Sequence, residues 1–265
     1  MRRDRVGAIL VAAGEGLRLD ADAATPKALV ALAGLPLVAH AARRLVAGGV
    51  TTLVVAHHPE HRDATAAALR GIGVATVLVP GGATRADSVR AGLAALPPGL
   101  DIVAVHDAAR PLVPPAVVAA AIDALVDDVV ASAPALPLAD TLKHVTDDGT
   151  VSTRPRDGLV GVQTPQVLRR DVLEAALAAA AASSAVDTDE LVPVERLLAE
   201  GRLAGRIVLV EGSPLAHKVT YRRDLELLEA LVGSHPDAAL PDAAGASTAM
   251  TDAADPAGPP GSEEA

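Results

Sequence analysis

Short β-branched runs alternate with longer helical stretches through the first hundred residues of the chain. The pattern predicts helices at Leu37–Ala47, Glu60–Arg70 and Thr84–Leu96. It predicts strands between them, at Val6–Ala12, Thr51–Ala56, Val74–Val79 and Ile102–Val105. Such alternation is typical of an α/β protein whose doubly wound, mostly parallel sheet carries helices on both faces. Ligands of these sheets bind beyond the carboxyl ends of the strands, so we expect the chemistry in loops 13–27, 80–84 and 106–114.

The alternation ends near residue 135. Extended stretches at Thr141–Val145 and Val151–Arg154 flank Asp147-Asp-Gly149, which is a turn signal for a β-hairpin. A hairpin that leaves a doubly wound core has little to pack against. We therefore predict a protruding β-arm at about 137–161 that contacts a second subunit of a homodimer. Beyond it we predict helices and one strand, at Asp171–Ala182, Thr188–Gly201, Arg206–Glu211 (the strand) and Arg222–Val232.

The composition changes at residue 233. Pro, Gly, Ala, Ser and acidic residues dominate positions 233–265, which predicts a disordered acidic tail after a single domain of residues 1–232. The tail holds six acidic residues and no Lys or Arg, whereas the whole chain has a net charge of −10. The domain itself is therefore only mildly acidic. That balance disfavours nucleic-acid binding but permits a phosphate pocket lined by a few cations.

The chain of 265 residues contains no Cys, Phe or Trp. Without Cys, disulfides, a thiolate nucleophile and a Cys-based zinc site are excluded. Without Phe or Trp, stacking platforms for single-stranded nucleic acid are not expected. The apolar run at 6–13 is too short to span a membrane, and it enters a Gly-rich charged loop instead of a signal-peptide cleavage site. We expect a cytoplasmic protein that binds neither nucleic acid nor membrane.

The first candidate motif is Ala12-Ala-Gly-Glu-Gly-Leu-Arg18, directly after the first predicted strand. Its small residues would let backbone N–H groups approach phosphate oxygens, namely at Ala12, Ala13, Gly14 and Gly16. Arg18 and Lys27 would add positive charge. The segment lacks the Gly-Lys-Ser/Thr of a P-loop and the third Gly of a dinucleotide fingerprint. A tight turn with surface charges is the alternative interpretation.

The second motif is Gly81-Gly-Ala-Thr-Arg-Ala-Asp-Ser-Val89. Thr84 and Asp87 have the spacing of a capping box, so we expect a helix to begin there. The exposed N–H groups of this helix start and the Ser88 hydroxyl could contact the edge of a base. Ordinary helix capping explains the motif without any ligand.

The third motif is Val105-His-Asp-Ala-Ala-Arg-Pro111. It places the carboxylate of Asp107 just past a predicted strand, at the carboxyl edge of the sheet. There the carboxylate could accept hydrogen bonds from a ribose or bind Mg²⁺. A structural ion pair between Asp107 and Arg110 is the alternative.

In this order the three motifs resemble those of the 2-C-methyl-D-erythritol 4-phosphate cytidylyltransferases, enzymes of non-mevalonate isoprenoid biosynthesis. The resemblance spans roughly residues 6–230 and continues through Ala139-Asp-Thr-Leu-Lys143, Thr164-Pro-Gln166, Thr188-Asp-Glu190 and His217-Lys-Val-Thr220. The Gly-rich loop alone is shared with many nucleotidylyltransferases, so only the ordered set indicates this substrate. The resemblance implies a Rossmann-like nucleotidyltransferase fold. It also implies transfer of CMP from CTP to the polyol phosphate, which gives 4-diphosphocytidyl-2-C-methyl-D-erythritol and pyrophosphate.

The resemblance also implies a role for each matching residue. Arg18 and Lys27 match cations that stabilise charge developing on the α-phosphate. Arg156 and Lys218 match the pair that holds and orients the methylerythritol phosphate. CTP, bound with Mg²⁺, would contact Ala12, Ala13, Gly14, Gly16, Gly82, Ser88 and Asp107. The second substrate would contact Thr141, Arg156, Thr164 and Lys218, where Thr141 and Arg156 belong to an arm that reaches into the partner subunit's site.

The chain departs from the family pattern at three points. The segment from Arg18 to Pro26 is slightly longer than usual, so the loop that carries Lys27 could follow another path. Leu17 stands where a second Arg is common. Arg154 competes with Arg156 for the substrate role, although the spacing to Gly158 favours Arg156.

Two other functions remain open from the sequence: a cytidylyltransferase for ribitol 5-phosphate or another polyol phosphate, and a non-catalytic nucleotide sensor. Retention of all four cations argues against the sensor. A fusion with a second enzyme is not expected, because the segment after the domain is too short for one. His57, His58 and His61 are expected to be strand-end histidines, since His57-His-Pro-Glu-His61 lacks the zinc-protease pattern.

Overall fold

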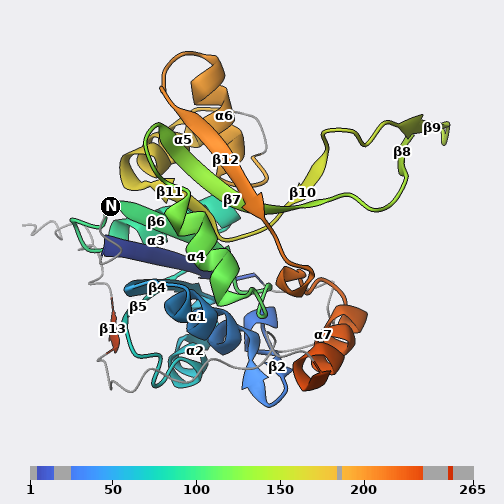
Figure 1. Cartoon of the computed structure of the whole chain (residues 1–265). Coiled ribbons are helices and arrows are strands. Elements are labelled where there is room, and N and C mark those ends of the chain that lie inside the picture. Colours follow the sequence, from blue (N-terminus) through green and yellow to red (C-terminus); the bar gives the residue numbers. More distant parts are fainter. Residues whose placement is uncertain (1–4, 15–24, 184–186, 235–249, 253–265) are drawn as a thin grey trace, which may run out of the picture.

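The computed structural model describes residues 5–14, 25–183, 187–234 and 250–252. Its centre is a nine-stranded sheet with the order β10–β7–β11–β6–β1–β4–β5–β13, and β12 pairs with β7 (Figure 1). The strands of this sheet are β1 (Val6–Ala12), β4 (Thr52–His57), β5 (Ala75–Pro80), β6 (Ile102–Asp107), β7 (Val129–Pro137), β10 (Val160–Val162), β11 (Gln166–Arg169), β12 (Arg206–Glu211) and β13 (Met250–Asp252). Two small hairpins accompany it, β2–β3 (Ala31–Leu32, Leu35–Pro36) and β8–β9 (Leu142–Val145, Val151–Arg154).

The part of the sheet that was predicted from the sequence is parallel. Strands β6, β1, β4 and β5 are neighbours, and Gly7 of β1 lies opposite Thr52 on one side and Val103 on the other. Both flanks of β1 are therefore occupied, and strands buried on both faces read as nearly continuous apolar runs. In a parallel block the carboxyl ends of all four strands meet at one edge, which is the edge that carries the site.

Helices cover both faces of the sheet, as the doubly wound prediction requires. The helices are α1 (Leu37–Ala47), α2 (Arg62–Ala68), α3 (Arg85–Ala95), α4 (Pro115–Asp123), α5 (Arg170–Ala181), α6 (Leu191–Ala199) and α7 (Arg222–Ser234). Three short 3-10 helices are η2 (Lys27–Leu29), η3 (Pro59–His61) and η4 (Pro214–Ala216). Buried residues of α1 and α4 join one apolar cluster, and those of α3, α5 and α6 join another.

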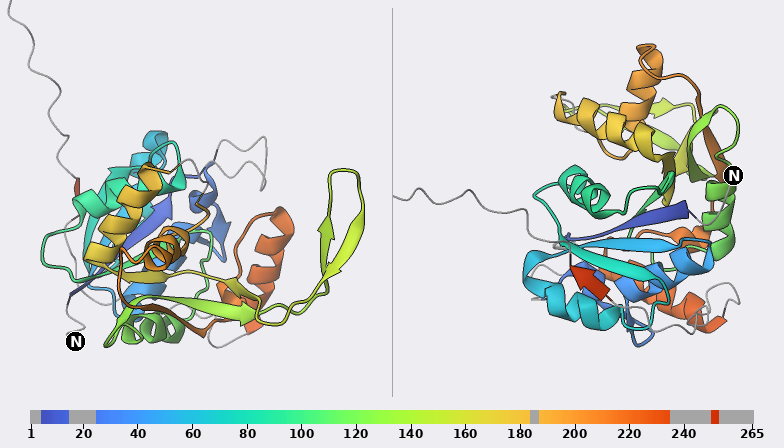
Figure 2. Two further views of the ribbon diagram at one scale, coloured as in Figure 1. Left: turned by 90° about the horizontal axis from the view of Figure 1, so that it is seen from above. Right: turned by 90° about the vertical axis from the view of Figure 1, so that its left-hand side faces the viewer.

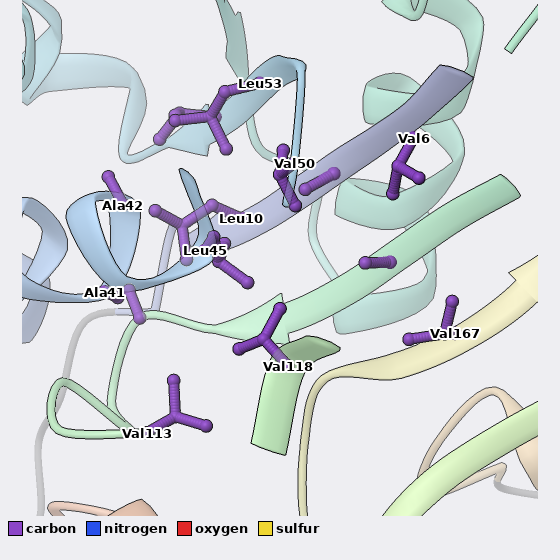
Figure 3. Packing of buried hydrophobic residues seen from close by; sticks show 14 of the residues in the cluster. Val6, Leu10, Ala41, Ala42, Leu45, Val50, Leu53, Val113, Val118 and Val167 are labelled. Carbon is purple, nitrogen blue, oxygen red and sulfur yellow. The ribbon is translucent and has the colours of Figure 1, made fainter. Parts of the chain in front are cut away.

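Strand β1 lies between these two clusters. Val6 and Leu10 face the cluster that contains Leu45 of α1, as Figure 3 shows. Ile9, which points to the opposite face, packs in the cluster that contains Val89 of α3. The alternation follows from the two-residue period of a strand. Because the core is built from Val, Leu, Ile and Ala on both sides, β1 is held rigidly and the loop after it starts from a fixed point.

Several predicted elements are confirmed within a residue or two, but the middle of the chain was underestimated. The bounds of β1, α1, β9 and β12 are those predicted. Helix α4 and strands β7, β10 and β11 were not predicted. The stretch Val129–Pro137 contains Ala, Ser and two Pro residues and so has weak β-propensity. It becomes a strand because β11, β12 and β10 all pair with it.

The predicted arm is present as the β8–β9 hairpin, and it stands well away from the sheet in Figure 2. Val145 and Val151 are about three-fifths exposed, at 60% and 59%. Two β-branched apolar side chains exposed side by side are typical of a surface that another chain covers. The hairpin places them opposite one another.

The end of the chain differs from the predicted disordered tail at three residues. Met250–Asp252 form β13, which pairs in parallel with the outer strand β5. An unpaired edge strand offers its backbone groups to any added strand, which explains why a short segment can dock there. In the residues that the structure describes, no helix combines the length and apolarity needed to cross a bilayer.

Candidate active site

A cavity of about 1050 Å³ lies at the carboxyl ends of β1, β4, β5 and β6. The loops after these strands line it with residues 11–14, 58–60, 81–85 and 107–109. Lys27, Ala28, Ser88 and Lys218 complete the lining. The cavity is therefore where the strand order predicted a ligand site, and the wall combines small residues with cations and carboxylates.

Two of the predicted motifs meet in this wall. A side chain at Gly81 would place its Cβ 2.1 Å from the Cβ of Ala13, so the loop after β5 packs directly on the loop after β1. The Gly81 N–H donates to the His57 carbonyl at 2.8 Å, which ties the same loop to the end of β4. Only glycine allows so close an approach. The first motif and the second are thus parts of one surface.

The predicted capping box is confirmed at the start of α3. Thr84 accepts from the Asp87 N–H at 3.0 Å, and Asp87 accepts from the Thr84 N–H at 3.2 Å. Ser88 is buried; its hydroxyl accepts from the Gly82 N–H and donates to the Thr84 carbonyl, both at 3.1 Å. The two residues predicted to contact a base, Gly82 and Ser88, therefore bind one another and fix the shape of this loop.

Lys27 and Lys218, from distant parts of the chain, both line the cavity. The Lys27 Nζ donates to the Val219 carbonyl at 3.1 Å, and the Val219 N–H donates to the Ala109 carbonyl at 2.8 Å. Val219 therefore anchors its segment to the loop after β6. This anchoring places the neighbouring Lys218 over the carboxylate of Asp107.

Asp107 is buried at the end of β6 and is bound by two cations. Its Oδ2 accepts from the Lys218 Nζ at 2.6 Å, and its Oδ1 accepts from the Arg85 Nε at 3.1 Å. Burial by itself would raise the pKa of Asp107, but the charges of Arg85 and Lys218 outweigh it and hold that pKa well below its usual range. The alternative pair with Arg110 is not formed, because Arg110 donates to the Ala216 carbonyl at 2.7 Å.

Arg85 extends this charge chain to the second half of the domain. Its Nη1 forms a short ion pair with Glu190, whose side chain is only 4% exposed. Burial raises the pKa of Glu190, although Arg85 opposes the rise. Burial by itself would lower the pKa of Arg85, but the negative charges of Glu190 and Asp107 outweigh burial and raise that pKa. Glu190 directly precedes α6, but it is the side chain of Asp189 that accepts from the first N–H groups of that helix.

A series of hydrogen bonds between uncharged groups holds the backbone of Asp107 in place. The Asp107 N–H donates to Thr164 Oγ1 at 3.2 Å, and the Thr164 hydroxyl lies 2.9 Å from His106 Nδ1. His106 Nε2 lies 3.2 Å from the Arg110 carbonyl, which can only accept, so Nε2 carries the proton. Burial lowers the pKa of His106 to about 4, and the ring is neutral at pH 7. Thr164 therefore positions Asp107 and does not line the cavity.

Only some of the remaining predicted residues lie at the cavity. Ala12, Ala13 and Gly14 line the cavity, whereas Arg18 and Gly16 lie outside the described residues. Thr141 and Arg156 are exposed on the arm, where Arg156 donates to the carbonyls of Leu138 and Ala139. Within one described chain, Lys27 and Lys218 are therefore brought together, but Arg156 is not.

Arg85 and Glu190 were not predicted as site residues. Both lie inside motifs that were quoted, at Gly81–Val89 and Thr188–Glu190. No local pattern links positions 105 residues apart. The only available signal was a second acidic residue directly after Asp189, which one helix start does not require.

A doubly wound sheet with a glycine-lined, cation-bearing cavity at the carboxyl ends of its parallel strands defines a nucleotide-binding α/β protein. Comparison with known proteins identifies the family within this class. The family model described as 2-C-methyl-D-erythritol 4-phosphate cytidylyltransferase matches residues 6–234. The chain belongs to this family.

Individual relatives agree with the family match. The enzyme of that name from Streptomyces avermitilis is 43% identical over 242 residues, covering 86% of this chain and 92% of the relative. The one from Frankia casuarinae is 45% identical over 230 residues, covering 86% and 81%. The crystal structure of the Thermus thermophilus enzyme superposes with a TM-score of 0.68 at 30% identity, covering 85% and 98%.

These findings confirm the predicted resemblance, the fold class and the enzyme class, nucleotidyltransferase. They also support the predicted reaction, cytidylyl transfer from CTP to 2-C-methyl-D-erythritol 4-phosphate in isoprenoid biosynthesis. They favour this reaction over the ribitol phosphate and sensor alternatives.

Proposed function

We propose that the cavity beside β1 binds CTP and that Lys27 and Lys218 act there in the transfer of CMP to 2-C-methyl-D-erythritol 4-phosphate. The assignment depends on one observation: both lysines line the same glycine-lined cavity at the carboxyl ends of the strands. The triphosphate lies along Ala12–Gly14, which line the cavity at the end of β1. The cytosine lies against the Gly81–Thr84 loop, which Ser88 holds in place.

The chemistry needs charge and alignment more than covalent help. The attacking oxygen belongs to a phosphate that is already ionised, so no general base is required. The enzyme must hold that oxygen in line with the α-phosphorus and neutralise the charge that develops on the phosphoryl oxygens. Lys27 supplies charge on the triphosphate side. Lys218, whose Nζ is held by Asp107, faces the phosphate of the second substrate.

Mg²⁺ fits this site as a companion of CTP. Asp107 and Glu60 are the carboxylates among the described lining residues, and Mg²⁺ is usually bound through one or two carboxylates together with substrate phosphates. Oδ1 of Asp107 faces both Nε and Nη2 of Arg85, whereas Oδ2 accepts one hydrogen bond, from Lys218, and keeps a second lone pair. Asp107 would therefore be the protein ligand. The ion would add positive charge at the phosphates when bound.

The arm completes the site from a second copy of the chain. Arg156 and Thr141 are exposed on a hairpin that carries apolar side chains in solvent, Val145 and Val151. Insertion of the arm beside a partner's cavity buries those side chains and delivers Arg156 to the second substrate. The active species is then a homodimer, and we place it in the cytoplasm.

The test is pyrophosphate release with CTP and Mg²⁺, comparing 2-C-methyl-D-erythritol 4-phosphate with ribitol 5-phosphate. The first should be clearly preferred. Lys27→Met should lower kcat on the order of 10²–10³-fold, as removal of an oxyanion-stabilising donor does, with little change in the melting temperature. Arg206→Met is the control, because its exposed guanidinium pairs with Asp128 on the surface, away from the cavity. Near-normal turnover of Lys27→Met would refute the assignment of the cavity.

Mixing two inactive variants tests the exchanged arm. In a mixed dimer of Lys27→Met and Arg156→Met chains, one site has both lesions and the other has neither, provided that the arm acts on its partner. Random exchange makes half of the dimers mixed, so about one quarter of wild-type activity should return. If Arg156 serves its own chain, both sites of the mixed dimer stay damaged. No recovery despite confirmed subunit exchange would refute the arrangement.

A further inference from the structure

A group of three metal-ligand side chains lies at the rim of the cavity, outside the machinery described above. His58, Glu60 and His61 each offer one ligand atom, and these atoms all lie within 4.8 Å of one another. His58 and Glu60 line the cavity itself. From the sequence, these histidines were expected to be ordinary strand-end residues.

The local backbone explains why it is His58 that joins His61. The His61 N–H donates to the His58 carbonyl at 3.0 Å, which closes the 3-10 turn η3. Side chains at positions i and i+3 of a 3-10 turn are eclipsed, so the two imidazoles come to the same side. Their ring centroids are 5.2 Å apart. His57, by contrast, is buried, and its Nδ1 is bound to the His58 carbonyl at 2.8 Å.

The ligand atoms are available. His58 Nδ1 accepts from the Glu60 N–H at 3.4 Å, so the neutral ring carries its proton on Nε2, and Nδ1 would exchange this long hydrogen bond for the ion. Among the described side chains none forms an ion pair with Glu60, which is exposed and can rotate. Small rotations bring the three atoms to about 2.0–2.2 Å from a common ion. Pro59 stiffens the turn and limits the entropy lost on binding.

We propose that His58, Glu60 and His61 form a three-ligand site for a Zn²⁺-class divalent ion whose open position faces the nucleotide cavity. Two imidazole nitrogens and one carboxylate favour Zn²⁺, Co²⁺ or Ni²⁺ over Mg²⁺, which prefers oxygen ligands alone. A three-ligand set leaves a coordination position for water or a phosphate oxygen. The ion would add positive charge to the wall that receives CTP, so the coupling to CTP rests on the proposed function.

Binding is tested first without nucleotide, so that it does not depend on the assigned reaction. The full chain in excess Mg²⁺ should bind one Zn²⁺ with micromolar affinity by competition against a chromophoric chelator. His61→Asn should weaken binding at least about tenfold, and Glu60→Gln should weaken it too. His144→Asn, an exposed arm histidine, is the matched control and should bind as wild type does. No binding, or equal loss in the control, would overturn the site.

Co²⁺ gives a spectroscopic check. The wild-type chain should develop visible d–d bands typical of nitrogen and oxygen ligation, and His61→Asn should not, although it folds normally by circular dichroism. Unchanged bands in a folded His61→Asn chain would overturn the ligand assignment.

The coupling is tested by the KM for Mg·CTP with and without micromolar Zn²⁺. The wild type should show a KM lower by about fivefold when Zn²⁺ is bound, and His61→Asn should show no change. An equal effect on both would mean that Zn²⁺ acts on CTP in solution, and it would overturn the orientation toward the cavity. Activity in Mg²⁺ with a zinc chelator reports the assigned reaction separately.

Discussion

Removing either partner of the ion pair between Arg85 and Glu190 should lower the free energy of unfolding. The side chains are 27% and 4% exposed, so neither charge is well solvated. Arg85→Met leaves the carboxylate of Glu190 buried without a cation, and removing one partner of a buried pair costs about 3–5 kcal/mol. Glu190→Gln leaves Arg85 its second partner, Asp107, so we expect a smaller cost of about 1–3 kcal/mol.

A double-mutant cycle isolates the interaction. The chain carrying both substitutions has no buried charge left unpaired at position 190, so it should lose less than the sum of the single losses. We expect a coupling free energy of about 1–3 kcal/mol, which is the range for contacting residues. The measurement is urea unfolding at pH 7, comparing midpoints after checking that the slope m is unchanged.

The matched control is an exposed pair of the same chemistry. Arg206 and Asp128 bind at 2.9 Å with side chains 55% and 61% exposed, so their cycle should give a coupling below about 1 kcal/mol. If the Arg85 and Glu190 losses are additive, or no larger than those of the exposed pair, then burial of this pair does not tie the two halves of the domain together.

Two further predictions follow from the site. Arg85 and Lys218 outweigh burial and depress the folded pKa of Asp107 below its unfolded value of about 4. The stabilisation from Asp107 is therefore present above that pH and is lost as the pH falls toward the folded pKa. Acid unfolding below about pH 4 should therefore be less steep in Asp107→Asn. Gly81→Ala should lower stability by about 1–3 kcal/mol, because its Cβ would overlap Ala13. Thermal unfolding of each variant measures this loss. Gly233→Ala is the control, because Gly233 has open space around it, and it should show no loss.

The sequence predicted those elements whose signal is local. Val6–Ala12 and Leu37–Ala47 were placed correctly because a short, nearly continuous apolar run and an amphipathic helix are both recognised from neighbouring residues. The capping box at Thr84 and the hairpin turn at Asp147-Asp-Gly149 are likewise decided by neighbouring residues. Strand β7 escaped prediction, because an Ala- and Pro-containing segment becomes a strand only when partners flank it.

The features of the site also divide into those that the sequence predicted and those that it did not. Three of the loops that line the cavity, and Lys27 and Lys218, were found from ordered motifs together with the rule that ligands bind at strand carboxyl ends, whereas the loop at 58–60 was not among the predicted ones. The hydrogen bond between Gly82 and Ser88 was not foreseen, nor was the cluster of His58 with Glu60 and His61. Each depends on side-chain directions that a turn sets in space.

The sequence alone determined the fold class, the edge of the sheet that carries the cavity and the family, because these depend on periodicity and on motifs in a fixed order. Only the tertiary structure decided which charges meet. Asp107 binds Arg85 and Lys218 instead of its neighbour Arg110, and the side chain of Glu190, at the start of α6, binds Arg85 as well. The reason is physical: a buried charge must find an opposite charge, and the partner within reach depends on how the chain is folded, whatever the separation along the sequence.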